Sequence, residues 1–245
     1  MNDLYFLSVN INGVYDKLEN LECIEFLALF DIVFVFELKC TNPVNVPGFK
    51  AIRSSFIKGE DLRGGTAVLV KHELWLSVCR VKRYKDQVWF TLSVAPYVRF
   101  GAVYIPPSDS PYFDPVSFAH IRSECLAHPR SIFSGDINAR IPELSEFQNE
   151  EYCAEYETNV DRGSNSNGTE FSAVWKECHL LPINHLKLNG KSFAGDLTFR
   201  KSRNWISQLD WLVCDVNSLS CINSLSIMQN TLRSARNRHV CASTR

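Results

Sequence analysis

Apolar residues along the chain fall in short runs separated by polar segments that contain glycine, proline or asparagine. The run 4–12 predicts a buried strand that turns polar at its end, and 17–30 places leucines and their neighbours at helical spacing. The β-branched and aromatic run 31–39 predicts a second strand, which contains Glu37 near its end. A strand, a helix and a strand in this order indicate a parallel pair joined by a crossover helix.

The same patterns extend through the rest of the chain. They predict helices at 116–127 and 169–181, with a long polar loop over 145–170. Further strands are predicted at 49–55, 64–71, 88–94, 99–106 (paired with 88–94 around Pro96), 130–138, 197–201, 207–214 and 219–228. No repeat or low-complexity linker divides the sequence, so we expect a single domain over residues 1–245. This mixture favours an α/β (α+β) fold with two sheets packed face to face and helices outside.

Composition and charge narrow the class of protein. Hydrophobic residues make up 45% and charged residues 22% of the 245 residues, which is ordinary for a globular protein. The net charge of −1 gives no overall basic field, so binding to a polyanion would need local patches. The most apolar stretch, 24–36, contains two acidic residues and is too short to span a bilayer, so no membrane partner is expected.

Cysteine usage bears on the compartment. The nine cysteines are scattered singly and form no CxxC pair, which argues against a structural zinc site. An odd count without a secretory signal favours reduced thiols. We therefore expect an intracellular protein, nuclear or cytoplasmic.

Polar residues able to do chemistry stand at the ends of several apolar strands. The stretch "SIFSGDINAR" (131–140) places Asp136 and Asn138 on one side of an extended chain, an anionic acceptor beside a neutral amide. The other such residues are Asn10, Asn12, Glu37, Tyr104 and Asp210. Each alone could cap a turn, face solvent or fill the core. Their recurrence favours a shared ligand site, because ligands gather at strand ends.

Six segments carry a family resemblance when read in order. They are "LSVNINGV", "DIVFVFELK", "GAVYIPPS", "FSGDINAR", "NGTEFSAVWKECHLLPIN" and "LTFRKSRNWISQLDWLV". Together they resemble the endonuclease/exonuclease/phosphatase superfamily, most closely the apurinic-type endonuclease domain of non-LTR (LINE-like) retrotransposons. The resemblance implies a DNase I-like four-layer sandwich of two mixed β-sheets flanked by helices. It also implies a DNA endonuclease that nicks target DNA by hydrolysing a phosphodiester bond.

The resemblance further implies a metal site and a water-activating group. Glu37 would hold Mg²⁺, or Mn²⁺ in its place, with Asn10 and Asp136 contributing to the same site. Asp136 would align and deprotonate the attacking water, and Asn138 would fix its direction. No small organic cofactor is implied.

Substrate contacts follow from the same likeness. Tyr104 would bond a phosphate oxygen, His239 would stabilise the developing phosphate charge, and Asp210 would orient the imidazole of His239. DNA would be bound mainly through its backbone phosphates. The residues implied to contact or support it are Asn12, Thr198, Arg200, Trp205 and Ser207. A reverse transcriptase further along a longer polyprotein would be a partner.

One departure from the family pattern keeps two alternatives open. The family usually ends in Ser-Asp-His, whereas "SARNRHV" places Arg238 before His239. Exchanging an aspartate for an arginine changes the local charge by two units, and loss of one well-placed electrostatic group can slow a reaction about a hundred- to a thousandfold. The alternatives are a catalytically silent, domesticated or decaying retroelement domain that binds nucleic acid or a protein, and a superfamily phosphoesterase acting on an inositol phosphate, lipid or RNA.

Overall fold

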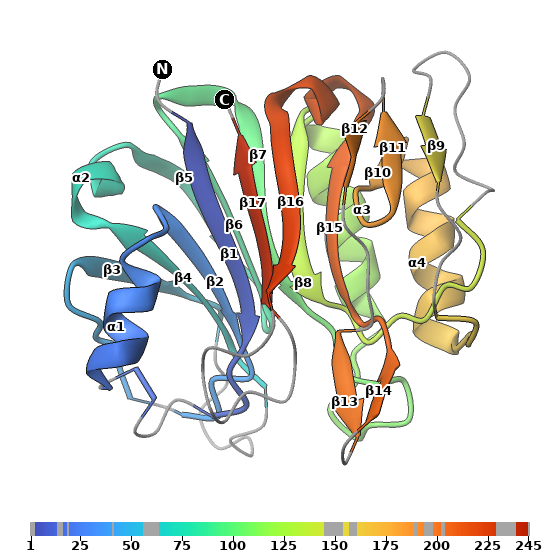
Figure 1. Cartoon of the computed structure of the whole chain (residues 1–245), viewed down its shortest axis with the longest axis horizontal. Helices are drawn as coiled ribbons and strands as arrows, with labels where there is room; N and C mark the ends of the chain where they lie inside the picture. The colour runs from blue at the N-terminus through green and yellow to red at the C-terminus, as the bar shows by residue number, and fades with distance from the viewer. Residues whose placement is uncertain are drawn as a thin grey trace.

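Two six-stranded sheets pack face to face in the computed structural model, with helices on their outer faces (Figure 1). The structure describes residues 3–13, 17–18, 20–40, 42–55, 64–144, 154–156, 161–188, 191–193, 198–201, 204–228 and 239–244. Among these residues, no helix has the length and apolar character needed to cross a membrane. The fold class expected from the sequence, two mixed sheets flanked by helices, is confirmed.

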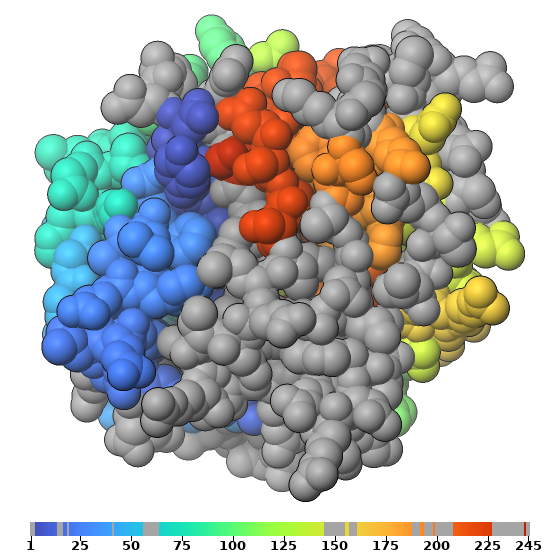
Figure 2. Space-filling view, viewed as in Figure 1, coloured from blue at the N-terminus to red at the C-terminus, as the bar shows by residue number. Residues whose placement is uncertain are grey.

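The first sheet has the order β16-β17-β1-β2-β4-β3. Its strands are β1 (Leu4–Asn10), β2 (Ile32–Phe36), β3 (Phe49–Arg53), β4 (Thr66–Lys71), β16 (Ile222–Met228) and β17 (His239–Thr244). β1 and β2 are parallel and are joined by helix α1 (Leu21–Leu27), as the sequence predicts. β16 is an edge strand, and Figure 2 shows it at the surface beside the N-terminal part of the chain.

The second sheet has the order β10-β15-β8-β7-β6-β5. Its strands are β5 (Val78–Arg83), β6 (Gln87–Leu92), β7 (Ala95–Tyr104), β8 (Ser131–Asp136), β10 (Leu180–Pro182) and β15 (Asp210–Asp215). Helices α3 (Val116–Ala127) and α4 (Ser166–Glu177) cover its outer face (Figure 1). β7 and β8 are parallel, and the other neighbours in this sheet are antiparallel.

Several short strands and helices lie outside the two large sheets. Strands β9 (Ala154–Tyr156), β11 (Leu186–Leu188) and β12 (Lys191–Ser192) form a small sheet, and β13 (Phe199–Lys201) pairs with β14 (Asn204–Ser207) as a hairpin. Helix α2 (His72–Trp75) follows β4, and the 3₁₀ helix η3 (Val216–Cys221) follows β15.

Alternating side chains of the central strands build the core on both sides of each sheet. Phe6 stacks on Phe34 and Phe100 between the two sheets, with ring centroids 6.0 and 5.5 Å apart. Neighbouring residues of the same strands, such as Leu7 and Val33, point outward and pack under α1. Because β1 and β2 are buried on both faces, their sequences read as continuous apolar runs.

Several element boundaries differ from the sequence-based expectation. α1 begins at Leu21 because the side chain of Asn20 accepts the backbone N–H of Glu22 and caps the helix. α4 begins at Ser166, inside the expected loop. Pro96 lies within β7 rather than at the hairpin turn. β17, which the sequence analysis does not contain, lies between β1 and β16 in the first sheet.

Candidate active site

Strand register brings three of the expected site residues side by side. Asp136 ends β8, the strand between β7 and β15. It stands opposite Tyr104 on β7 and opposite Asp210 on β15. The sequence spacing of these residues gives no hint of this row, which depends on one parallel and one antiparallel pairing of the same strand.

The first sheet supplies the other side of the site. Asn10 ends β1 opposite Phe36 of β2, so the next residue, Glu37, emerges at the same edge. The Nδ2 of Asn10 donates to Oε1 of Glu37 at 2.8 Å and to Oδ2 of Asp136 at 2.7 Å. Oδ1 of Asn10 accepts the backbone N–H of Asn12 at 2.9 Å, which fixes the orientation of the amide. One side chain therefore bridges the two sheets and holds two carboxylates beside each other.

Burial and like charge dominate the electrostatics of this cluster. Asp136 and Asp210 are each 2% exposed. Burial raises the pKa of Asp136 well above its usual range, the negative charges of Asp210 and Glu37 raise it further, and hydrogen bonds from Asn10 and the Asn138 backbone act in the opposite direction. A cation or a proton that binds beside such a carboxylate therefore stabilises it.

Tyr104 faces the same carboxylates. Burial raises the pKa of its phenol, and the charges of Glu37, Asp136 and Asp86 raise it further. The phenol is therefore protonated at neutral pH and can donate a hydrogen bond. A protonated hydroxyl beside carboxylates can donate to an anionic ligand oxygen once a cation has offset the negative charge.

Lys39 also belongs to the cluster, although the sequence analysis did not select it. Its Nζ pairs with Oε2 of Glu37 at 2.6 Å and hydrogen-bonds to Oδ1 of Asn12. The two-residue spacing that singled out Asp136 and Asn138 applies equally to Glu37 and Lys39, so the sequence did contain the signal. The Lys39 side chain is about one-third exposed and brings a positive charge to the rim of the site.

Backbone strain is concentrated at the same place. Seven non-glycine residues of the described chain have positive φ, and four of them are Asn12 (47°), Glu37 (53°), Lys39 (49°) and Asn138 (49°). A non-glycine residue in this region costs on the order of 1 kcal/mol, less for asparagine. Strained backbone that clusters around buried carboxylates is typical of a functional site.

The donor set suits a hard divalent cation. Glu37 and Asp136 offer carboxylate oxygens, the ligands that Mg²⁺ prefers, and the negative potential around Asp136 favours a cation. Asn10 turns its Nδ2 toward these carboxylates and its Oδ1 toward the Asn12 backbone, so in this structure it orients the carboxylates rather than offering an oxygen of its own. Among the described residues, no three histidine, cysteine or acidic side chains gather as a preformed metal cage. Mg²⁺ usually needs only one or two carboxylates, with waters and phosphates completing its shell, so the residues fit it.

Two of the other expected residues support the backbone. Nδ2 of Asn138 donates to the carbonyl of Ile105 at 2.9 Å, which ties the ends of β7 and β8 together. Thr198 is fully buried, and its Oγ1 accepts the backbone N–H groups of Leu209 and Asp210. Thr198 thus supports the start of β15, and its burial excludes direct contact with DNA in this structure.

The remaining expected residues are placed only in part. Arg200 lies in β13, Trp205 and Ser207 lie in β14, and His239 begins β17, but their side chains lie outside the described part of the chain. Arg238 lies outside the described residues altogether. Their expected roles stay predictions.

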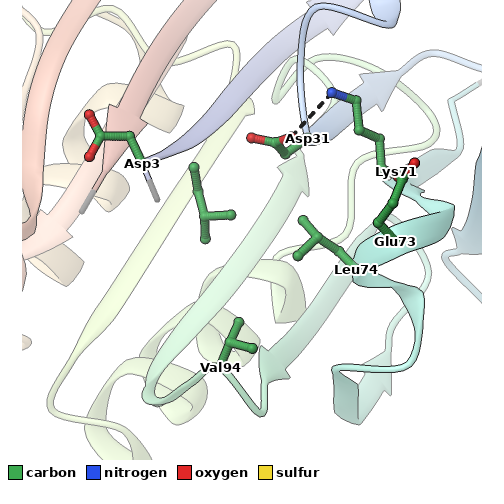
Figure 3. Close-up of a pocket in the computed structure, with 7 residues that line it drawn as sticks. Asp3, Asp31, Lys71, Glu73, Leu74 and Val94 are labelled. Carbon is green, nitrogen blue, oxygen red and sulfur yellow. Dashed lines mark hydrogen bonds and ion pairs between the residues drawn. The ribbon is translucent and has the colours of Figure 1, made fainter. Parts of the chain in front are cut away.

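A pocket of about 400 Å³ lies at the opposite end of the strands (Figure 3). Its lining residues are Asp3, Leu4, Asp31, Lys71, Glu73, Leu74 and Val94. None of the expected site residues lines it.

Comparison with known proteins places the fold. No protein-family model matches the chain, and no curated protein sequence matches it. Solved structures do. The AP endonuclease LMAP from Leishmania major aligns with a TM-score of 0.73 at 14% identity, covering 99% of this chain and 88% of that one. The 3′ phosphatase NExo from Neisseria, bound to a product DNA hairpin, aligns with a TM-score of 0.70 at 14% identity over 99% of both chains.

A retrotransposon protein is among the structural matches. The endonuclease domain of TRAS1, a telomere-specific non-LTR retrotransposon, aligns with a TM-score of 0.65 at 15% identity, covering 100% of this chain and 99% of that one. The chain therefore has the DNase I-like fold of the endonuclease/exonuclease/phosphatase superfamily, a fold of nucleases and phosphoesterases. The likeness read from six sequence segments is confirmed at the level of fold.

Proposed function

We propose that the chain is a Mg²⁺-dependent DNA endonuclease of retrotransposon origin, which nicks DNA by hydrolysing a phosphodiester bond. The observation that carries the proposal is the bridge from Asn10 to both Glu37 and Asp136, beside the row of Tyr104, Asp136 and Asp210. Segments from both sheets thus present their polar ends to one spot. Burying like-charged carboxylates together costs folding free energy, and such arrangements are typical of functional sites.

The chain's own groups suit hydrolysis of a phosphodiester. Asp136 accepts the proton of the attacking water, because its surroundings raise its affinity for a proton. Tyr104 donates a hydrogen bond to a phosphate oxygen. Mg²⁺ held by Glu37, with Asn10 and Asp136 beside it, supplies the counter-charge that the transition state needs. Lys39 adds a positive charge at the rim, where a phosphate would approach.

DNA is the substrate class that the structural neighbours favour. One neighbour is an AP endonuclease, one is bound to a DNA hairpin and one is a retrotransposon endonuclease domain. The six sequence segments favour the retrotransposon type, from which we infer a nuclear or cytoplasmic protein and a reverse transcriptase as its partner in a longer polyprotein. The contacts with DNA are expected along the backbone phosphates, near the β13–β14 hairpin with Arg200, Trp205 and Ser207.

A plasmid assay tests the proposal. Supercoiled plasmid is incubated with the chain in Mg²⁺ or in EDTA, and nicked circles are measured. We expect nicking that needs Mg²⁺ and falls at least about a hundredfold in Glu37→Gln. The matched control is Glu73→Gln, which changes a glutamate at the opposite end of the strands and should nick like the wild type. Equal nicking by both variants would reject the proposed site.

Arg238 favours a second candidate, a catalytically silent domain that binds nucleic acid or a protein. In that case the wild type binds DNA without cutting it, and Arg238→Asp gives Mg²⁺-dependent nicking if the site is otherwise intact. Parallel incubations with a phosphoinositide and with poly(A) separate both candidates from a phosphoesterase acting on inositol phosphates, lipids or RNA. A product from either substrate, with intact plasmid, would replace the endonuclease proposal.

A further inference from the structure

Behind the candidate site lies a second polar layer, which hydrogen-bonds to the backbone of the segments that carry Asn138 and Asp210. It is formed by Asp161 and by Asn165, the N-cap of α4, which precede the helix, and by Asn167 in its first turn, all within the range 145–170 that is predicted from the sequence as a loop. We call these three residues the positioning loop. We propose that the positioning loop sets the spacing between the strand ends that carry Asp136 and Asp210, with Asp161 as its central residue. This inference rests on the proposed function for its catalytic meaning, but its structural content can be tested separately.

Asp161 connects two separate segments of the site with one carboxylate. It is 2% exposed. Its Oδ1 accepts from Nη2 of Arg140 at 2.7 Å, and its Oδ2 accepts the backbone N–H of Gln208 at 2.8 Å. Arg140 is two residues after Asn138, and Gln208 is two residues before Asp210. A shift of Asp161 therefore moves both strand ends.

The two asparagines fasten the same segments at other points. Nδ2 of Asn165 donates to the carbonyl of Asn138 at 2.7 Å, and its Oδ1 accepts the backbone N–H of Arg140 at 3.0 Å. Nδ2 of Asn167 donates to the carbonyls of Ile137 at 2.9 Å and Pro106 at 3.0 Å. The positioning loop thus holds the chain on both sides of Asn138 and reaches the segment that follows Tyr104.

Close packing leaves little slack in these contacts. A Cβ atom at Gly163 would overlap the guanidinium of Arg140, and one at Gly168 would overlap the carbonyl oxygen of Arg140. Asn138, between these contacts, adopts a positive φ of 49°, which asparagine tolerates better than most residues. The sequence signals are the glycines of "RG" and "NG" in 162–168, which leave room for Arg140.

The energetic reason for such a layer lies in the site itself. Asp136 and Asp210 stand directly opposite each other on neighbouring strands and are both buried, so their negative charges repel each other. Repulsion pushes the strand ends apart, and bonds to the surrounding backbone resist it. Misplacing a catalytic group by about 1 Å can cost on the order of a hundredfold in rate.

Hydrogen exchange measures the positioning without requiring activity. The reporters are the amides of Ile137, which donates to Leu209 at 3.0 Å, and Ile105, which donates to Asp136 at 3.0 Å. Both amides donate to backbone carbonyls rather than to Asp161. Their exchange therefore reports the pairing of the strand ends, not the loss of the Asp161 contacts themselves. We expect Asp161→Asn to speed exchange at Ile137 by about tenfold or more at equal temperature and pH.

A matched control separates positioning from general stability. Glu124 is also a buried carboxylate bound by an arginine, Arg99, but it lies on α3. Glu124→Gln therefore removes a charge of the same kind and burial. Exchange at Ile137 is compared after the loss of global stability of each variant, measured by urea unfolding, is accounted for. A remaining rise that is equal in Glu124→Gln and Asp161→Asn would overturn the proposal, as would no remaining rise in Asp161→Asn.

Kinetics then connect the positioning to the reaction. With plasmid nicking as the assay, Asp161→Asn should lower kcat about a hundredfold while KM stays within about twofold. Arg140→Lys keeps the charge beside Asp161 and serves as the milder variant, with a kcat between those of Asp161→Asn and the wild type. If Asp161→Asn loses exchange protection at Ile137 and the wild type does not nick, the positioning stands and the proposed function fails. If the wild type nicks and Asp161→Asn nicks equally fast, the positioning proposal fails.

Discussion

Carboxylates lie at both ends of the central strands, but at one end the carboxylate is paired with a cation and at the other its charged neighbours are carboxylates. At one end, Asp31 precedes β2 and lines the pocket of Figure 3, where Lys71 reaches it with its Nζ 3.2 Å away. The backbone N–H of Tyr5 donates to its other oxygen at 2.9 Å. At the opposite end, Asp136 is buried, accepts from the neutral amide of Asn10, and has two further carboxylates as neighbours.

A third carboxylate shows that burial alone is not the difference. Glu124 is as buried as Asp136, yet Arg99, Lys82 and Tyr84 all donate to it or pair with it. Burial by itself would raise the pKa of Glu124, but these bonds together outweigh burial and hold the pKa below its usual value. Asp136 shows the reverse shift. The candidate site is therefore distinguished by a buried carboxylate whose charged neighbours are also negative.

The largest expected effect comes from removing the charge of Asp136. Asp136→Asn should lower Mg²⁺-dependent nicking by at least about a thousandfold, because it removes both the proposed base and a metal-side carboxylate. The same change should raise the stability of the metal-free protein by about 1 kcal/mol, since repulsion with Asp210 and Glu37 disappears. Plasmid nicking and urea unfolding at pH 7 measure the two effects. Lower stability together with unchanged nicking would mean that Asp136 is a structural carboxylate like Glu124.

The next effect concerns stability at the fully paired carboxylate. Glu124→Gln should destabilise the fold by about 3–5 kcal/mol at pH 7, because Arg99 is left buried without its partner. Plasmid nicking per folded molecule should not change. Urea unfolding curves of variant and wild type at one temperature give the difference, and a loss below about 1 kcal/mol would contradict the contrast with Asp136.

The same residue gives a pH dependence with a definite sign. The pKa of Glu124 is lower in the folded than in the unfolded chain, so its contribution is complete above the unfolded value, near 4.5, and is lost as the pH falls through the folded pKa. The stability difference between wild type and Glu124→Gln should therefore shrink as the pH drops below about 4.5. Unfolding free energies of the pair at several pH values test this, and a difference that grows on acidification would reverse the assignment.

Lys39 provides a smaller effect within the site. It is the one described cation paired with Glu37, so Lys39→Gln should free that carboxylate and tighten Mg²⁺ binding about two- to fivefold, the scale of a partly exposed ion pair. Calorimetric titration of the metal measures this without DNA. Weaker binding in the variant would mean that Lys39 organises the metal ligands rather than competing with the metal.

The comparison also explains what the sequence could and could not predict. Strand-end polarity selected Asn10, Glu37 and Asp136, which lie together in the structure, because apolar runs predict strands and the ends of neighbouring strands meet at one edge. Asp210 lies inside the predicted strand 207–214, and the structure places it at the start of β15 opposite Asp136. β17 was missed although it lies inside the first sheet, because its sequence, HVCAST, consists mainly of small and polar residues and contains no long apolar run.

Other features depend on pairing that no local pattern contains. No strand is predicted over β5, because it is an edge strand whose basic residues are exposed to solvent and interrupt its apolar pattern. The positioning loop reads as a polar turn because its partners, Arg140 and Gln208, are brought to it only by the fold. Periodicity reports which face of an element is buried, whereas the hydrogen bonds between distant polar segments are decided by tertiary structure.

The smallest expected effect on stability and nicking comes from Asp31, at the end of the strands that carries the pocket. Asp31→Asn removes one partner of a partly exposed ion pair but leaves an oxygen that can accept the Tyr5 backbone N–H, so the stability loss should stay below about 1 kcal/mol. Nicking should not change, because the substitution lies at the far end of β1 and β2 from Asn10 and Glu37. A change in nicking of tenfold or more, measured beside Asp136→Asn, would mean that the two ends are coupled through the central strands. In that case, the contrast between Asp31, which is paired with a lysine, and Asp136, which has carboxylates as neighbours, would no longer be enough to locate the active site.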